Sequence, residues 1–514
     1  THRGSSAASD VYKRQHMNTA DLEICYLSAN EAIKKFKNKS ISPVELLQEI
    51  IKRIESINPE INAFNQLYFE KALKEAKKSE DKYFSDALTL PLDGLPTAIK
   101  DEVSIDGQIN TMGSQMFKNN LSRHTDIDVE RIVNSGAIIH ARSTCPEFSL
   151  TSFTHSILNG VSKNPWNLNF SPGGSSGGSG ASLAAGMTTI ATGSDIGGSI
   201  RIPASACGIV GYKPPYGRNP IAHPFNLDHY CVVGPMARTV SDCALMQNVM
   251  CGPHPNDITT ISPKKTLSLD YENIKGWKIA YSLDLGFFEV DETVEKNTLE
   301  AVEKFKTLGA SVNEIKLNWK KEEVDSTCYS HYAGGAFFRT LAEVPEDERQ
   351  EMTEYAQMYA KLSDLHFKAI AEDKKIYSDE LGAYLGYTSR DCANVAGEMY
   401  LEISPILEEY DILVCPTNCL PSVKADMDLK KDKVIINNKV QEGPDVSWCM
   451  SYPFNILGRL PVLAVPSGFS NLGVPTGIQL VSKAFCDEKV FQGGYNFEKL
   501  DPWLNSKEKW PLIG

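Results

Sequence analysis

The sequence predicts an α/β fold built on a mixed or parallel β-sheet. Short apolar runs of strand length alternate along most of the chain with amphipathic segments of helical period. Glycine ends several of the helical segments, for example Gly136 and Gly309, and a predicted strand follows each of them. With 514 residues, of which 42% are hydrophobic and 23% charged, the chain can bury a large core. We therefore expect an ordinary globular protein.

The first part of the chain contains the clearest helix and strand signals. Ser42-Pro-Val-Glu45 matches a capping box with proline at the first helical position, and apolar residues then recur at steps of three and four as far as Ile57. After a turn, Thr97–Ile105 predicts a strand that carries Lys100 and Asp101 in its middle, where charged residues require an explanation. The other elements expected up to residue 200 are helices over 69–78, 125–135 and 175–185, strands from 137 and over 188–192, a tight loop at 193–198, and a short helix that opens at Ser199.

The second part begins with the same alternation and then becomes largely helical. Helices are expected over 240–250 and 291–308, and strands over 277–281 and 311–315. Residues 320–410 are mostly helical and charged in pattern, with a break at Gly334-Gly335, and look like an insertion or lid. Strands return at Ile412–Cys415, Val462–Val465 and Gly477–Val481, and these are expected to close the sheet that begins near Lys100.

The domain organisation follows from these elements. Residues 1–16, which precede Met17, resemble a tag-like or artefactual segment, and we exclude them from the fold. The remainder, 17–514, is expected to form one domain, with 320–410 as a helical substrate-pocket insertion.

Charge and composition exclude several classes of function. A net charge of -13 and a pI near 5.4 argue against a protein that binds nucleic acid through a basic face. Because no run of about 18 apolar residues occurs, we expect no membrane span, and we expect a cytoplasmic location. The twelve cysteines lack the paired spacing of a zinc ribbon. Even the pair Cys415 and Cys419 has no accompanying histidine, so the cysteines indicate reduced thiols and no metal site.

The most unusual stretch is rich in glycine and serine. It covers 171–182 and 193–203, and eleven of the 36 glycines lie between 173 and 211. A phosphate-binding loop is disfavoured because the pattern G-x-x-x-x-G-K-[ST] is absent. A nucleophile elbow centred on Ser176 matches G-x-S-x-G formally, but no strand precedes it. The last histidine is His366, whereas an elbow serine normally needs a histidine late in the chain.

A serine nucleophile that works without histidine is the remaining interpretation. A serine hydroxyl needs a base within hydrogen-bond reach, and a lysine can supply it where burial in a low-dielectric site favours the neutral amine. Lys100, which lies in an apolar strand, is the candidate base. A second serine can pass the proton between the nucleophile and the lysine, which gives a reason for a serine-rich loop beside a glycine-rich one.

These residues carry a resemblance to a known family. Gly173-Gly-Ser-Ser-Gly-Gly178, Gly193-Ser-Asp-Ile-Gly-Gly-Ser-Ile-Arg-Ile-Pro203 and the upstream Ile99-Lys-Asp101 together resemble the motifs of the amidase signature family. Ser199 follows Ser175 by 24 positions, as in that family. Looser similarity covers nearly the whole chain after Met17. The resemblance implies a mixed central sheet flanked by helices on both faces.

The resemblance also implies roles for individual residues. Ser199 would be the nucleophile that forms the acyl-enzyme, Ser175 the bridging serine held by a cis peptide, and Lys100 the general base. Asp195 and Arg201 would support the nucleophile loop as an ion pair. The oxyanion would be held by backbone N–H groups of the segment Ile196, Gly197, Gly198 and Ser199. Neither a metal nor a cofactor is implied.

The implied function is hydrolysis of an amide bond through a seryl acyl-enzyme, releasing a carboxylate and an amine or ammonia. Xenobiotic amides, such as aminohexanoate oligomers, aryl amides or carbamates, are candidate substrates. The main alternative is the A subunit of a glutamyl-tRNA(Gln) amidotransferase complex, which acts as a glutaminase and transamidase. A catalytically inactive binding protein is disfavoured because all three motif residues are present. The expected partner is a small-molecule amide, without nucleic acid or membrane, and the chain is a candidate homodimer.

Residues that shape the substrate pocket are harder to identify from the sequence. Cys328 could line an acyl pocket, although a buried structural thiol is favoured. Trp448, Tyr452 and Phe454 could shape the mouth of the site, although aromatic packing in the core is the default interpretation.

Overall fold

The structure, a computed structural model, describes residues 19–504, 507–511 and 513. An eleven-stranded sheet forms the centre of this part of the chain. The predicted tag-like segment 1–16 lies outside these residues. In sheet order the strands are β1 (Phe64–Leu67), β3 (Ile138–Ser143), β2 (Pro96–Lys100), β6 (Ile190–Asp195), β8 (Val232–Ala237), β7 (Val210–Lys213), β16 (Val462–Phe469), β17 (Pro475–Val481), β13 (Ile412–Pro416), β9 (Lys278–Tyr281) and β10 (Ser311–Glu314).

The sheet is mixed. β2 runs parallel to both of its neighbours, β3 and β6, and β9 runs parallel to β10 and β13. The strands between these two groups pair antiparallel, from β6–β8 through β7, β16 and β17 to β13. The late strands β16, β17 and β13 therefore lie beside early ones, which confirms the prediction that the end of the chain completes the sheet.

Helices cover both faces of this sheet. Outside the 321–409 region they are α1 (Thr19–Cys25), α2 (Ala29–Lys37), α3 (Pro43–Ile61), α4 (Phe69–Phe84), α5 (Ile127–Asn134), α6 (Gly177–Ala184), α7 (Arg201–Cys207), α8 (Val240–Met250), α9 (Glu292–Thr307), α14 (Pro453–Ile456) and α15 (Asp487–Leu500). Strand β17 shows the two faces. Gly477 packs on Ser205 of α7, whereas Leu480, three positions on and hence on the other side, lies against Gly494 of α15. The predicted fold class is thus confirmed.

The capping box predicted for α3 is present. Ser42 Oγ accepts a hydrogen bond from the Glu45 N–H at 3.2 Å, and a Glu45 carboxylate oxygen accepts one from the Ser42 N–H at 2.7 Å. The apolar residues at steps of three and four, including Leu47, Ile50 and Ile57, are buried. Pattern and capping chemistry therefore indicate the same helix.

Several element boundaries differ from the predictions. β2 ends at Lys100 instead of continuing to Ile105, because the Val103 N–H turns back to the Lys100 carbonyl at 3.3 Å. Lys100 is therefore the last residue of a strand and not a charge in its middle. The run 77–82 continues α4 to Phe84 instead of ending it, and β6 extends to Asp195, which shortens the expected loop.

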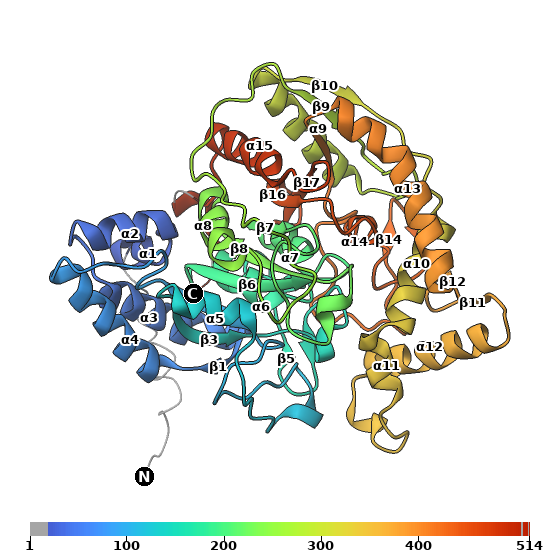
Figure 1. The fold of residues 1–514 in the computed structure, drawn as a ribbon, viewed down its shortest axis with the longest axis horizontal. Helices are drawn as coiled ribbons and strands as arrows, with labels where there is room; N and C mark the ends of the chain where they lie inside the picture. The colour runs from blue at the N-terminus through green and yellow to red at the C-terminus, as the bar shows by residue number, and fades with distance from the viewer. Residues whose placement is uncertain (1–18, 505–506, 512, 514) are drawn as a thin grey trace, which may run out of the picture.

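Residues 321–409 contain α10 (Lys321–Gly334), α11 (Ala336–Ala342), α12 (Glu354–Ala371) and α13 (Ser389–Glu409). A hairpin of β11 (Ile376–Ser378) and β12 (Ala383–Leu385), absent from the helical prediction, lies between α12 and α13. Figure 1 shows these helices gathered on the side of the molecule opposite α1–α4. That this segment is a substrate-pocket insertion stays a prediction.

In the part of the chain that the structure describes, none of the helices is both long enough and apolar enough to cross a bilayer. Within the same residues, no three His, Cys, Asp or Glu side chains gather as metal ligands.

Stability should depend on pH through Glu498 of α15. Its carboxylate accepts a hydrogen bond from the Val240 N–H at 3.0 Å, and burial, assisted by Asp242, raises its pKa from 4.5 to about 8. The folded protein then holds this proton at pH values where the unfolded chain has lost it. The contribution is fully present below pH 4.5 and is lost as the pH rises through about 8. Glu498→Gln keeps the acceptor and does not titrate, so its stability relative to the wild type should increase from pH 5.5 to 8.5, roughly in the range where the wild-type group titrates.

Thermal melting of both proteins across that interval measures the effect. A difference in melting temperature that stays constant with pH would contradict the assignment.

Candidate active site

Lys100 and Ser175 are in direct contact. Lys100 is fully buried, and its Nζ donates a hydrogen bond to Ser175 Oγ at 2.7 Å and another to Ser194 Oγ at 2.9 Å. Ser175 precedes α6, and the Gly174–Ser175 peptide bond is cis, the form that the family resemblance implies. Because β2 lies next to β6 in the sheet, the end of one strand brings the amine to the Ser194 hydroxyl of the other.

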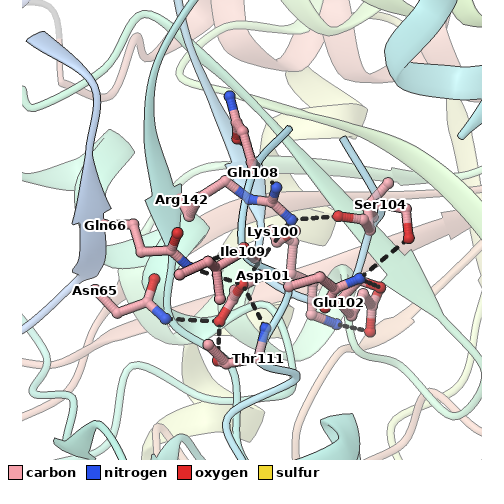
Figure 2. A network of polar contacts seen from close by, with 12 residues as sticks. Asn65, Gln66, Lys100, Asp101, Glu102, Ser104, Gln108, Ile109, Thr111 and Arg142 are labelled. Atoms are coloured by element: carbon pink, nitrogen blue, oxygen red, sulfur yellow. Dashed lines mark hydrogen bonds and ion pairs between the residues drawn. The ribbon is translucent and has the colours of Figure 1, made fainter. Parts of the chain in front are cut away.

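The backbone of Lys100 is held from both sides. Its N–H donates to Thr192 Oγ1 at 3.2 Å, and its carbonyl accepts from the Arg142 guanidinium at 3.2 Å. The next residue, Asp101, has a buried carboxylate that accepts hydrogen bonds from the side chains of Asn65, Gln66 and Thr111 (Figure 2). Burial raises the pKa of Asp101, while Arg142 and these donors act against that rise. This network fixes the strand end from which the amine projects.

Ser199 lies just before α7 and is 8% exposed. Its carbonyl accepts a hydrogen bond from the Ser176 N–H at 3.1 Å, which joins the two serine-containing loops. Both Ser175 and Ser199 lie at loop-to-helix junctions, but the N-cap positions belong to Ser176 and Ile200. Neither serine is therefore placed there as a helix cap.

Two distant side chains orient the loop before Ser199. Tyr332 Oη donates to the Ile196 carbonyl at 2.8 Å, and Ser451 Oγ donates to the Gly197 carbonyl at 2.7 Å. In a trans peptide the N–H points opposite to the carbonyl, so these contacts direct the N–H groups of Gly197 and Gly198 the other way. Among the described residues, no acceptor bonds to the N–H groups of residues 196–199. They are available to an oxyanion.

Gly198 is required for this geometry. Its φ is +128°, in the region that side chains rarely adopt, and a Cβ there would lie 1.9 Å from Ser451 Oγ. Glycine thus allows Ser451 to approach the loop.

Asp195 and Arg201 form a fully buried ion pair with an N–O distance of 2.8 Å. Burial would raise the pKa of Asp195, but the Arg201 charge together with hydrogen bonds from Arg201 and Asn455 brings the pKa below its ordinary value. Asp195 also accepts a hydrogen bond from the Ile200 N–H at 3.2 Å. The guanidinium further donates to the Ser451 carbonyl, the Asn455 side chain and Gln479.

Two cavities meet at the serines. One of about 40 Å³ lies on the Ser199 side, and its lining includes Ile202, Tyr329, Tyr332, Phe338 and Tyr359. The other, of about 320 Å³, lies on the Ser175 side, and its lining includes Glu102, Ser194, Asn110, Phe117, Asp126 and Phe225. Ser149 and Ile196 line both cavities, so the two spaces are adjacent across the serines.

The aromatic residues proposed for the mouth of the site do not line either cavity. Trp448, Tyr452 and Phe454 are buried in the core around α10 and α14, where Trp448 Nε1 donates to Ser152 Oγ at 2.9 Å. Cys328 is a buried thiol, as favoured, and its helix neighbours Tyr329 and Tyr332 face the cavity instead. The core hypothesis was therefore the better one for all four residues.

Sequence reasoning missed Glu102, Ser194, Tyr332 and Ser451. Glu102 and Ser194 lie inside the quoted motifs or next to them, so their positions offered a signal. Tyr332 and Ser451 are more than a hundred residues away from the loop that they bind, and no local pattern marks them. Ser176, the centre of the formal elbow match, is fully buried and lines neither cavity, so the elbow interpretation has no support.

Comparisons with known proteins agree with this geometry. The Amidase family model matches residues 45–491. An acylamidase of Rhodococcus erythropolis is 30% identical over 493 residues, covering 95% of this chain and 98% of the relative. The glutamyl-tRNA(Gln) amidotransferase A subunit of Geotalea daltonii is 31% identical over 503 residues, covering 94% and 99%. The crystal structure of a bacterial aryl acylamidase of the amidase signature family has a TM-score of 0.82 at 25% identity, covering 94% and 97%.

The role of the buried ion pair can be tested with a matched control. Arg201→Met leaves Asp195 buried without its partner and should destabilise the protein by about 3–5 kcal/mol. Arg218→Met breaks the similarly buried bidentate pair with Asp487, at 2.7 Å, and should destabilise it by a comparable amount. Only Arg201→Met should accelerate hydrogen exchange in the segment from Ile200 through α7, by about tenfold or more, because the Ile200 N–H donates to Asp195 and only this ion pair holds that segment.

Melting curves and peptide-resolved hydrogen exchange measure the two effects. Equal exchange in this segment for both variants would show that the pair does not order it.

Proposed function

As the chain belongs to the amidase signature family of amide hydrolases, we propose that it cleaves small-molecule amides through a seryl acyl-enzyme, with Ser199 as nucleophile. The observation that carries the proposal is the 2.7 Å contact between Lys100 Nζ and Ser175 Oγ, in a loop that is hydrogen-bonded to Ser199. It brings together a buried base, a relay hydroxyl and a second serine.

In the acylation step Ser199 Oγ attacks the amide carbonyl carbon. Its proton passes to Ser175, and the Ser175 proton passes to the neutral amine of Lys100. The carbonyl oxygen becomes an oxyanion, and the proposed donors to it are N–H groups of 196–199, of which those of Gly197 and Gly198 are directed by the contacts of Tyr332 and Ser451. Each well-placed oxyanion donor stabilises such a transition state by about 3–4 kcal/mol. Tyr332 and Ser451 contribute because they fix the direction of these donors before substrate binds.

The same relay then works in reverse. The Lys100 ammonium returns its proton through Ser175 to the amide nitrogen, the C–N bond breaks, and a neutral amine leaves. Water attacks the acyl-enzyme and gives its proton to the relay, which releases the carboxylate and restores Ser199. An amine leaves poorly unless it is protonated, so a relay that both accepts and donates suits amides.

The proposed proton relay predicts which part of the substrate occupies each of the two cavities. Because Ser175 protonates the leaving nitrogen, the amine part of the substrate belongs in the 320 Å³ cavity that Ser175 lines. The acyl part then occupies the aromatic cavity of about 40 Å³ beside Ser199, which has room for a small group. We therefore favour substrates with a short acyl group on a large amine, such as aryl amides. Aminohexanoate oligomers and carbamates remain less favoured candidates.

The second candidate is the A subunit of a glutamyl-tRNA(Gln) amidotransferase, since relatives of that name match as well as the acylamidase does. Such a protein would release ammonia from glutamine and work with partner subunits. A large cavity on the amine side favours the stand-alone hydrolase, because ammonia needs little space. A homodimer and a cytoplasmic location remain expectations.

The catalytic roles predict large losses of activity. Ser199→Ala should lower kcat for an amide by about 10⁴-fold or more, because the nucleophile is absent. Lys100→Met and Ser175→Ala should each lower kcat by about 10²-fold or more, because proton transfer fails. Mass spectrometry of protein stopped during turnover should detect an acyl adduct in the wild type and none in Ser199→Ala.

Lys213→Met is the matched control for Lys100→Met. Lys213 is also fully buried, but its Nζ donates to the Gly458 carbonyl at 3.1 Å. Lys213 lines neither cavity. The folded Lys213 variant should retain activity within about tenfold of the wild type. Full activity of Ser199→Ala would refute the mechanism.

Substrate size gives a separate prediction. Along a series of anilides, kcat/KM should fall by about tenfold or more when acetyl is replaced by a long acyl chain, because the acyl cavity is small. With acetyl held constant, enlarging the amine from ammonia to an aryl group should raise kcat/KM. The reverse order would exchange the two cavity assignments, and hydrolysis of glutamine alone would favour the amidotransferase.

A further inference from the structure

The amine of Lys100 has a third polar neighbour that the mechanism above does not use. A carboxylate oxygen of Glu102 lies 3.0 Å from Lys100 Nζ (Figure 2). It is a neighbour of the amine in addition to Ser175 and Ser194. Glu102 follows β2 in the turn that Val103 closes, and its side chain is 14% exposed toward the larger cavity. Three oxygens therefore surround a nitrogen that is itself fully buried.

Counting donors and acceptors gives these contacts a direction. A neutral amine has two N–H groups and one lone pair, and an ionised carboxylate can only accept. One N–H must then point at Glu102. Ser194 can accept the second, which leaves the lone pair directed at Ser175, as proton transfer from Ser175 requires. Without Glu102 the two remaining neighbours are hydroxyls, which can each donate or accept, so the direction of the lone pair is no longer fixed.

Charge gives Glu102 a second role. When the proton arrives, Lys100 becomes an ammonium in a buried site, and an adjacent carboxylate offsets the cost of burying that charge. Lys100 in turn acts on Glu102: burial would raise the pKa of the carboxyl, but the Lys100 charge together with hydrogen bonds from Ser149, Ser194 and Lys100 holds the pKa below its ordinary value. The carboxylate is therefore ionised while Lys100 carries its charge.

The other titratable groups around the amine are engaged elsewhere or stay neutral, with one exception: Asp128 lines the larger cavity, and burial and the charge of Asp126 raise its pKa from 3.8 to about 7. Asp101 is bound by Asn65 and Thr111 and lies 3.9 Å from Arg142. Asp195 is paired with Arg201. The nearby thiols of Cys145 and Cys231 have pKa values raised by burial and stay neutral. Asp126, across the larger cavity, accepts from the Ser104 N–H and lies beside His124.

We propose that Glu102 is a positioning residue that orients the Lys100 amine toward Ser175 and stabilises the ammonium formed during each proton transfer. The proposal rests on the proposed function. Glu102 gives up no proton itself; the proton moves from Ser199 through Ser175 to Lys100 and back, while the carboxylate remains charged.

The test is the pH profile of Glu102→Gln with an uncharged anilide substrate. Removing the carboxylate disfavours the ammonium, so the acidic limb of kcat/KM should move to lower pH by about 1–3 units. On the plateau kcat should fall by about tenfold or more, because the ammonium in the transition state has lost its partner, while KM changes little. Glu102→Asp keeps the charge on a shorter stem and should lie between Glu102→Gln and the wild type.

Asp126→Asn is the control, because it removes a carboxylate from the same cavity that does not contact Lys100. Its acidic limb should move much less than that of Glu102→Gln. An acidic limb of Glu102→Gln that coincides with the wild type, or an equal shift in Asp126→Asn, would overturn the proposal. If Glu102→Gln melts below the assay temperature, Glu102→Asp provides the test. A kcat and a pH profile of Glu102→Asp that equal those of the wild type would then overturn the proposal.

These results are separable from the proposed function. That function fails if the wild type hydrolyses no amide or if Ser199→Ala stays active. The inference about Glu102 fails when the wild type and Ser199→Ala behave as predicted but the acidic limb of the kcat/KM profile does not move in Glu102→Gln.

Discussion

The architecture of the site depends on the guanidinium of Arg201. It is buried, and its five N–H groups are shared among Asp195 in β6, the Ser451 carbonyl, Asn455 in α14 and Gln479 in β17. Segments that are some 250 residues apart are thereby held against the loop that carries Ser199. Because a buried charge must keep its partners, any displacement of these segments relative to the loop carries a large energetic cost.

The same constraint explains why the C-terminal strands belong to the sheet. Gln479 of β17 both accepts from Arg201 and, through its amide, donates to the carbonyls of Pro416 and Met450. The Ser451 carbonyl that Arg201 binds and the Ser451 hydroxyl that binds the Gly197 carbonyl belong to one residue. The late part of the chain and the loop before Ser199 are thus joined through one residue, so late segments fix the position of candidate catalytic residues that are all early in the chain.

Local chemistry made part of this molecule predictable from its sequence. The α3 capping box and the Gly- and Ser-rich loops signal themselves within a few residues, whereas the strand predicted over Thr97–Ile105 ends at Lys100. Strand order has no such local signal, because β7 and β16 pair across about 250 residues and buried strands carry no alternating pattern. The residues of the candidate site differ in the same way. Lys100, Ser175 and Ser199 lie in local sequence motifs, whereas Tyr332 and Ser451 reach the site only through tertiary packing, which no short sequence pattern encodes.

The two cavities meet at Ser149 and Ile196. In the proposed mechanism the acyl group and the amine occupy different cavities. Once the amine has left, the acyl group still fills the small aromatic cavity, while the larger chamber is vacant on the side of the relay. Water is not the sole molecule able to enter that chamber. A second amine, or hydroxylamine, that binds there would be activated by the same Ser175 and would receive the acyl group in place of water. A hydrolase with separate acyl and amine cavities is also an acyltransferase. Its share of acyl transfer increases with how well a second amine binds in the larger cavity.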